Sequence, residues 1–444
     1  MPHPTQKKRF AVIGSGISGM SAAWLLNKSH DVVLYEREEI PGGHSNTVRV
    51  DGCAGPVDVD TGFIVFNEWT YPNLCALFDH LGVATEPSDM SFAVSANHGG
   101  FEYSGRSLAG LFGQPSNLAR PRFWRMLRDI KRFYGSTPGM LKNGALDGLS
   151  LGNILEQGKY SDDFQRDHLL PMAAAIWSGT VEGMRDYPAS AFVRFFVNHG
   201  LLNYLDRPVW RTVSGGSRRY VEKITENLTV RTSTGVAGVT RTANGVIVRD
   251  TNGHEDRFDG IVLATHADTT LSLLQDASDE ERRLLSPFKY QRNTAVLHAD
   301  EALMPKRKRM WSSWNYIADP MESGDTSVCV TYWMNLLQNL DRTQPLFVTL
   351  NPTRAPRDDA HFRTFEYDHP LFDTHTESAQ RALWQLQGRN RTWFCGSYFG
   401  AGFHEDGLQS GLAAAEHAGA VRRPWQVENE SGRIHLAPTQ EEAA

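Results

Sequence analysis

The chain has 444 residues, more than one hydrophobic core usually serves, so we expect two domains. Hydrophobic residues make up 40% and charged residues 22%, a composition typical of a globular protein with a large core. The net charge of -6 argues against a general nucleic-acid binder, and the cysteines form no CxxC pair, so we expect free thiols at Cys53, Cys75, Cys329 and Cys395.

The N-terminal stretch "RFAVIGSGISGMSAAWLL" predicts a buried strand over 9–13, a glycine turn and a helix. Gly14, Gly16 and Gly19 have G-x-G-x-x-G spacing, which allows a tight turn, backbone contact with a pyrophosphate and close helix–strand packing. The same glycines interrupt the apolar run, which argues against a signal peptide. A second strand, "DVVLYE", ends at Glu36, where a carboxylate binds the ribose hydroxyls of an adenosine. These features predict a dinucleotide site, with Ser18 and Arg37 beside it.

A Gly-Gly pair, Gly42 and Gly43, follows in "REEIPGGHSNTV". In many two-domain flavoproteins such a pair follows the ribose-binding acid and brings backbone next to the flavin. We therefore predict FAD as the cofactor, although Pro-Gly-Gly is also ordinary turn chemistry.

The stretch 121–134, "PRFWRMLRDIKRFY", predicts an amphipathic helix with a strong basic excess. A basic helix with aromatic residues can lie on an anionic bilayer. The alternative is a surface helix that packs inward and leaves its arginines in water, as amphipathic helices usually do.

The expected fold is α/β (α+β): a Rossmann-like FAD-binding domain with a discontinuous substrate domain of antiparallel sheet plus helices. The family resemblance described below implies a discontinuous FAD domain over 1–75, 213–275 and 385–425. We assign 76–212 (largely helical) and 276–384 (strand-like runs) to the substrate domain, and 426–444 to a loose polar tail. Aromatic residues on the strand-like runs either line a substrate pocket or fill the core of the sheet: Trp311, Trp314, Tyr316, Tyr332 and Trp333.

Near the C-terminus, "RTWFCGSYFGAGFHEDGLQSGLAAAE" predicts a strand over 392–395, a loop and a helix from about Gly407, with Asp406 as its N-cap. The positive end of that helix can stabilise an anionic reduced flavin. Adjacent residues rarely give one ion several ligands, so we expect no metal at the His-Glu-Asp run.

Together, the glycine motif, the acid, the Gly-Gly pair and this segment resemble the flavin-containing amine oxidase superfamily. That group includes amine oxidases, protoporphyrinogen oxidases and phytoene-type desaturases. "VSGGSRRYV", "VTYWMNLLQ" and "FCGSYFGAGFHEDGLQSGL" are similar to bacterial FAD/NAD-binding proteins associated with cyclopropane-fatty-acyl synthase-type enzymes. The resemblance implies modification of lipid acyl chains.

The resemblance also implies further flavin contacts. Asp406 would meet the ribityl chain, with Gly407 and Leu408 beside it, and Gly396 would approach the pyrophosphate. Val236 would contact the adenine, and Ala264 and Thr265 would lie near the cofactor. His44 stands where many relatives have an arginine.

Two positions depart from amine oxidases. Asn293 stands nearest the lysine that holds a water at flavin N5, although Lys289 is an alternative alignment. His404 stands near a tyrosine of the amine cage. His404 offers a proton acceptor near N5, or is a loop histidine bonded to backbone. Tyr367 and His369, in "YDHP", are expected to reach the flavin face.

We therefore expect an FAD-dependent oxidoreductase that dehydrogenates an activated lipid acyl chain, with His404 as first candidate base and His369 and Asn293 in support. The alternatives are an amine or amino-acid oxidase, an FAD-dependent double-bond isomerase, and a non-catalytic flavin-bound partner of a lipid methyltransferase. The sequence leaves the electron acceptor open. With no apolar run long enough to span a membrane, we expect a cytoplasmic protein, with contact at the inner membrane face through 121–134 as an open alternative.

Overall fold

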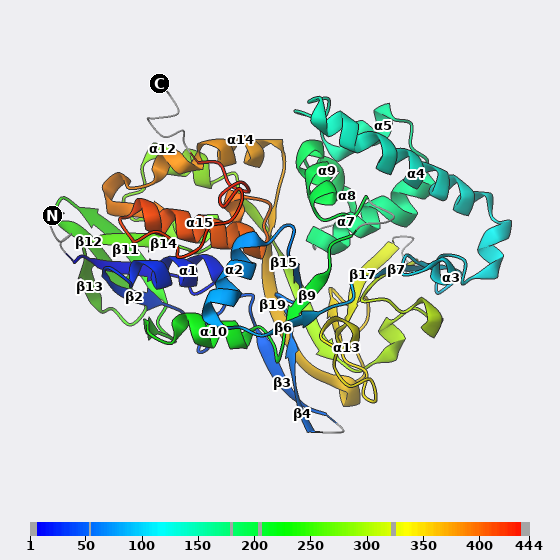
Figure 1. Ribbon diagram of the computed structural model, residues 1–444, viewed down its shortest axis with the longest axis horizontal. Coiled ribbons are helices and arrows are strands. Elements are labelled where there is room, and N and C mark those ends of the chain that lie inside the picture. Colours follow the sequence, from blue (N-terminus) through cyan, green and yellow to red (C-terminus); the bar gives the residue numbers. More distant parts are fainter. Residues whose placement is uncertain (1–6, 53–54, 178–180, 203–206, 321–325, 437–444) are drawn as a thin grey trace.

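The computed structural model describes residues 7–52, 55–177, 181–202, 207–320 and 326–436. Figure 1 shows a parallel sheet with its helices on the left, a long second sheet beside it, and a layer of helices at the upper right. Cys53 lies outside the described residues, whereas Cys75, Cys329 and Cys395 are free thiols.

The first part is a five-stranded parallel sheet of Rossmann type, and its strands come from all three predicted segments of the FAD domain. On β1, Phe10 and Val12 pack against the helical face, while Ala11 and Ile13 face a three-stranded meander. The strand order is β10 (Thr229–Arg231), β2 (Asp31–Tyr35), β1 (Arg9–Ile13), β14 (Gly260–Leu263) and β20 (Thr392–Phe394). The meander consists of β11 (Val236–Thr242), β12 (Gly245–Asp250) and β13 (Glu255–Phe258).

Helices cover this part of the molecule in two groups. In one group α1 packs on α15 and α10, and α2 packs on α15 and α10. Their bounds are α1 (Ile17–Leu26), α2 (Pro72–Leu81), α10 (Arg218–Thr225) and α15 (His404–His417). The other group is α11 (Ala267–Leu273), α12 (Asp279–Leu285) and α14 (Thr374–Leu383).

The second part is a seven-stranded sheet in which the β16–β7 pair is parallel and the other pairs are antiparallel. Its order is β19 (His361–Leu371), β15 (Lys289–His298), β18 (Phe347–Leu350), β17 (Thr326–Trp333), β16 (Trp314–Pro320), β7 (Phe92–Ala96) and β8 (Phe101–Ser104). Short pairings link the two parts through β3 (Thr47–Gly52), β4 (Gly55–Asp60), β5 (Phe66–Asn67), β6 (Thr85–Pro87) and β9 (Trp210–Val213). A short helix, α13 (Met334–Leu337), follows β17.

A helical layer covers one face of this sheet, and α7 contacts β16. It comprises α3 (Leu108–Leu111), α4 (Pro121–Lys142), α5 (Leu151–Gln157), α6 (Asp162–Phe164), α7 (Leu170–Trp177), α8 (Val181–Asp186) and α9 (Ala189–Asn198). The predicted helix at 121–134 is therefore the first part of α4. Its apolar side, with Phe123, Met126, Ile130 and Phe133, is buried.

The structure adds elements that the prediction for the substrate region did not contain. The stretch 76–212 is largely helical, as predicted, but β6, β7 and β8 occupy part of 85–104, and two of them complete the second sheet. These runs are short, and β6 and β7 pair with β9 and β16, which lie far along the chain, so local pattern carries little signal. The stretch 276–384 also holds α12 and α14 between its strands.

Candidate active site

The glycine turn lies between β1 and α1, where the ends of the parallel strands meet. A Cβ on Gly19 would lie 1.8 Å from the Gly14 carbonyl oxygen, so this glycine is required for helix–strand contact. A Cβ on Gly16 would meet no atom within 4 Å. That open space at a helix N-terminus is where a dinucleotide pyrophosphate binds in Rossmann folds.

Glu36 lies directly beside this turn and is almost fully buried. One carboxylate oxygen accepts from the Ser15 amide at 3.0 Å, and the other accepts from the Glu38 amide at 2.9 Å. The Ser15 hydroxyl also donates to Glu36 and accepts from the Gly42 amide at 3.0 Å. One serine thus ties the predicted ribose acid to the Gly-Gly pair.

The remaining predicted cofactor residues gather around the same strand ends. A Cβ on Gly43 would lie 3.2 Å from the Gly16 Cα, and the Ala264 amide donates to Ile13 at 2.9 Å. Val236 starts β11 just after Thr234, whose amide donates to the Glu36 carbonyl. The structure buries Ser18, Gly396, Gly407 and Leu408 at the α1–α15 contact and leaves Arg37 exposed.

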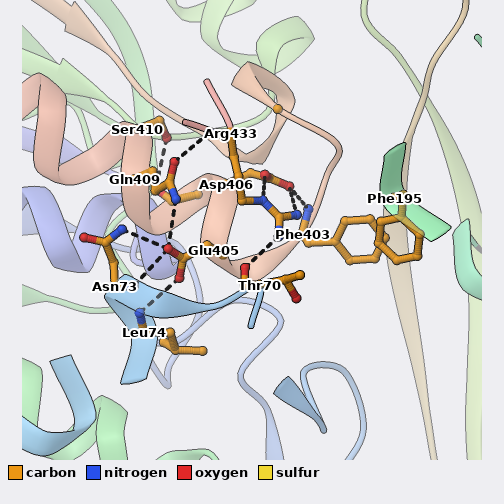
Figure 2. A network of polar contacts seen from close by, with 12 residues as sticks. Thr70, Asn73, Leu74, Phe195, Phe403, Glu405, Asp406, Gln409, Ser410 and Arg433 are labelled. Carbon is orange, nitrogen blue, oxygen red and sulfur yellow. Dashed lines mark hydrogen bonds and ion pairs between the residues drawn. The ribbon is translucent and has the colours of Figure 1, made fainter. Parts of the chain in front are cut away.

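The start of α15 differs from the prediction. The helix begins at His404 with Phe403 as N-cap, and Asp406 is the third helical residue, where it accepts from the Phe403 amide at 2.7 Å. Figure 2 shows that Asp406 also forms an ion pair with Arg433, from Nε to Oδ1 at 2.6 Å. The structure therefore assigns the Asp406 carboxylate to a buried ion pair with the C-terminal segment.

That ion pair corrects the prediction of a loose tail over 426–444. Arg433 donates to the Thr70 carbonyl at 2.9 Å, and Ile434 is buried. Beside it, buried Glu405 accepts from the Asn73 amide and side chain and from the Leu74 amide (Figure 2). Arg433 thus holds its part of the segment against the start of α15, and 437–444 lie outside the described residues.

A histidine cluster lies next to the Gly-Gly pair. The His44 ring centroid is 5.4 Å from that of His369 and 6.5 Å from that of His266, and the ring stacks on Tyr367 at 5.0 Å. Burial lowers the pKa of His369 to about 4 and holds the pKa values of His44 and His266 below their ordinary range. These imidazoles are neutral at neutral pH.

The hydrogen bonds around Asn293 determine which His369 nitrogen carries the proton. Asn293 Nδ2 donates to the Gln291 carbonyl at 3.1 Å, and Asn293 Oδ1 accepts from Asn351 at 2.8 Å, so the amide orientation is defined. The same Nδ2 lies 2.9 Å from His369 Nδ1, which therefore accepts. Neutral His369 then carries its proton on Nε2 and acts as a donor there. Lys289, the alternative alignment, is exposed at the strand start.

His404 is the first residue of α15. Its ring stacks on Phe63 with centroids 3.8 Å apart, and its Nε2 lies 2.6 Å from the Tyr220 hydroxyl and 3.3 Å from Ser45 Oγ. Burial lowers the His404 pKa to about 3. The ring is bonded to side chains, so the alternative of a loop histidine bonded to backbone is wrong.

The predicted substrate residues divide between two faces of the second sheet. Trp314, Tyr316 and Tyr332 share the face under the helical layer, and the Trp314 and Tyr332 rings meet edge to face at 4.7 Å. Trp333 follows Tyr332 on the strand, points to the opposite face, and packs in a separate cluster with Trp311. Its assignment to the same pocket is therefore wrong.

Tyr367 stands apart from these residues, on β19 beside the histidines. Its hydroxyl is 3.0 Å from Asn46 Nδ2 and 2.8 Å from Thr61 Oγ1.

The sequence reading missed three polar groups at this site. Tyr220 contacts His404, His266 stacks on Tyr290, and Asp60 is buried where it accepts from the Ser217 amide. Burial raises the Asp60 pKa to about 6. Of the three, only His266 could have been predicted as a site residue from the sequence, because it directly follows the "GIVLAT" strand.

The residues present fit a flavin dinucleotide. The open side of Gly16 leaves room for a pyrophosphate, and Glu36 is placed for a ribose. The buried His44 Nε2 has no hydrogen-bond partner among the described residues, as expected of a group that contacts a cofactor. The fold and site therefore define a dinucleotide-dependent oxidoreductase with a separate substrate sheet.

Comparison with known proteins identifies the family. The model of the flavin containing amine oxidoreductase family matches residues 17–418, and the chain belongs to that family. It is an FAD-dependent oxidoreductase.

Solved structures show the same fold. A fatty acid isomerase from P. acnes, described as CLA-producing, superimposes with a TM-score of 0.65 at 15% identity, over 93% of this chain and 98% of that one. Cyclohexylamine oxidase from Brevibacterium oxydans gives a TM-score of 0.64 at 16% identity, over 93% and 98%. Among curated relatives, the hydroxyneurosporene desaturase of Rubrivivax gelatinosus is 36% identical over 78 residues, which is 17% of this chain and 14% of the desaturase. This chain therefore spans only a small part of that relative.

Within the described residues, no helix has the length and apolar character that a membrane span needs, and no three His, Cys, Asp or Glu side chains gather as a metal site would require.

Proposed function

We propose that the protein dehydrogenates an activated, allylic or conjugated, lipid acyl chain. The observation that carries this proposal is an aromatic stack that connects the helical layer with the residue before His404. Phe195 on α9 stacks on Phe403 with centroids 4.6 Å apart, and Trp177 on α7 lies 4.7 Å from Phe195. These rings give a continuous apolar surface against which a hydrocarbon chain can pack. Aromatic faces also attract cations, so the titration with amines below decides between the two substrate classes.

The neutral histidines support the same substrate class. A protonated amine is best held by a carboxylate, but Asp368, the acid next to His369, is paired with Arg292 at 3.0 Å. His44, His369 and His404 have lowered pKa values and offer neutral donors and acceptors. Such groups orient a reacting carbon without adding charge to an apolar channel.

In this reaction two electrons and one proton leave one carbon as hydride, a second proton leaves the neighbouring carbon, and a C=C bond forms. Bound FAD supplies the hydride acceptor at N5. His404 is the candidate acceptor of the second proton. The Tyr220 hydroxyl, 2.6 Å from His404 Nε2, is already protonated, so it can only relay a proton by passing its own to Ser45 Oγ. A pKa of about 3 makes the His404 imidazolium costly, so the ring carries a proton only transiently. Because His369 Nδ1 accepts from Asn293, its Nε2–H is the group that can donate a hydrogen bond to the cofactor or the substrate.

The test is an anaerobic titration of the holoprotein, followed by the oxidised-flavin absorbance band. Phospholipids with allylic acyl chains should bleach the band, whereas a panel of amines should not. Bleaching by amines alone would refute the proposal. Shifted double bonds without lasting bleaching would instead indicate an isomerase.

The His404→Gln variant tests the assigned base. We expect flavin reduction by lipid to slow by about 10²-fold or more, as for loss of a general base. His417→Gln is the matched control, because His417 lies at the other end of α15, where it accepts from the Trp393 indole at 3.0 Å. Equal rates in the two variants would remove His404 from the mechanism.

A further inference from the structure

Large apolar side chains are exposed together at the corner where α3 leads into α4. Leu108 is 76% exposed, and Leu118 and Trp124 are each 49% exposed. The indole Nε1 of Trp124 donates to the Leu118 carbonyl at 2.9 Å, and the Phe112 and Phe123 rings pack behind it at 6.3 and 6.0 Å. The indole is therefore held in place at the surface, and contiguous exposed apolar groups of this kind mark interaction sites.

The surface around this corner is positively charged, although the whole chain carries -6. Within 120–132 and 162–167 there are seven arginine and lysine residues and four aspartates, a local excess of three positive charges. Arg122 and Arg166 both pair with Asp167, at 2.7 and 3.0 Å, so two cations share one carboxylate.

The same sharing occurs further along α4. Arg128 and Arg132 both lie 3.5 Å from the buried carboxylate of Asp129. Arg120 donates to a neutral acceptor, the Gly100 carbonyl, at 2.6 Å. The internal acids therefore do not cancel the positive charge of this helix.

A surface recess of about 560 Å³ opens beside the apolar corner. Three guanidinium groups line it, from Arg120, Arg122 and Arg125, together with the Phe101 ring. Arg122 lies over that ring at 4.4 Å. Arg122 and Arg125 already pair with Asp167 and Asp163, at 2.7 and 2.6 Å, so the recess can attract a phosphodiester through its positive charge rather than through free guanidinium forks.

We propose that this corner, defined by Leu108, Leu118, Trp124 and the arginines of 120–128, docks the protein on an anionic phospholipid bilayer. An indole and leucines flanked by arginines match the chemistry of the interface, where amphipathic rings lie at headgroup level and cations meet anionic lipid. The structure limits the contact to this corner, because the rest of the apolar side of α4 is buried.

The location of the corner fits a lipid substrate, and in this respect the inference rests on the proposed function. Figure 1 places α3 and the start of α4 at the right-hand end of the molecule. They belong to the same helical layer that covers Trp314 and Tyr332, and the Tyr332 hydroxyl donates to the Ala175 carbonyl of α7.

The test is flotation of the holoprotein with phosphatidylcholine vesicles, with and without phosphatidylglycerol. We expect binding to the anionic vesicles that falls as salt is raised. Trp124→Ala should weaken binding about tenfold, from lost apolar burial, and Arg128→Gln about fivefold. Trp69→Ala is the matched control, since Trp69 is also 49% exposed, on another part of the surface.

Equal binding to both vesicle types, or a Trp124→Ala variant that binds like wild type, would overturn the proposal. Self-association that Trp124→Ala abolishes, without vesicle binding, would assign the corner to a protein contact instead. Binding is measured without turnover, so its failure leaves the dehydrogenation proposal intact. If both proposals hold, Trp124→Ala loses activity on vesicles and keeps it on detergent-dispersed lipid.

Discussion

Replacing Arg433 by methionine tests whether the C-terminal segment stabilises the start of α15. Asp406 is fully buried, and its carboxylate is held by the Phe403 amide at 2.7 Å and by Arg433 at 2.6 and 3.2 Å. Arg433→Met removes the only cation that pairs with it among the described residues. Breaking a buried pair on one side costs about 3–5 kcal/mol, because a buried charge is left uncompensated.

We expect the first unfolding transition of Arg433→Met to fall by on the order of 10 °C, measured by thermal shift and by urea denaturation. Arg422→Met is the control, since Arg422 pairs with Glu416 at 2.6 Å but is 58% exposed, and such pairs contribute at most about 1 kcal/mol. The double variant Arg433→Met with Asp406→Asn should recover at least about half of the loss. Equal losses in the two single variants, or no recovery in the double variant, would refute the assigned ion pair.

Two further predictions concern the cofactor turn and pH. Gly16→Ala should change the stability of the apoprotein by no more than about 1 kcal/mol but weaken FAD binding at least about tenfold, because the added methyl group would occupy the space of the pyrophosphate. Gly19→Ala should destabilise the fold by about 3 kcal/mol or more, because its methyl group would clash with the Gly14 carbonyl. Urea melts and flavin titration separate the two effects, and identical behaviour would contradict the geometry. Burial lowers the pKa of His369 to about 4 and of His404 to about 3, below an unfolded value of about 6.5, so the unfolded chain binds more protons between these values. The urea midpoint should therefore fall as pH falls from about 6.5 to 4. Asp60, whose pKa is raised to about 6, has the opposite effect on the midpoint over this range. A rising midpoint would contradict the burial of the histidines.

The nucleotide half of the fold could be predicted because its signals are local. Gly14, Gly16 and Gly19 lie within six residues, and Glu36 directly follows the next strand, β2. The role of each of these residues follows from its place in one short strand–turn–helix–strand segment. In the structure all four lie around one turn.

The histidine cluster could not be predicted in the same way. His44 precedes β3, His266 follows β14, and His369 lies on β19. They come together only because β19 pairs with β15 in a register that sets His369 opposite Gln291. A register is a tertiary property, and a shift by one residue would turn His369 to the other face of the sheet.

The start of α15 shows a third kind of limit. Asp406 is a good N-cap by type, and the local pattern favours it. In the structure it occupies the third helical position, where it accepts from the Phe403 amide and pairs with Arg433, 27 residues later. The second of these contacts is tertiary, so local pattern cannot reveal it.

The order of the segments along the chain has a consequence for synthesis on the ribosome. The β1 strand needs Asp259, 250 residues later, and the Asn73 turn needs Glu405, 332 residues later. The flavin half therefore cannot close until nearly the whole polypeptide has emerged, and the small-residue face of α1 stays uncovered until α15 arrives. Such long-range closure is slow and exposes apolar surface to aggregation. The yield of holoprotein should therefore depend strongly on growth temperature and on riboflavin supply during expression.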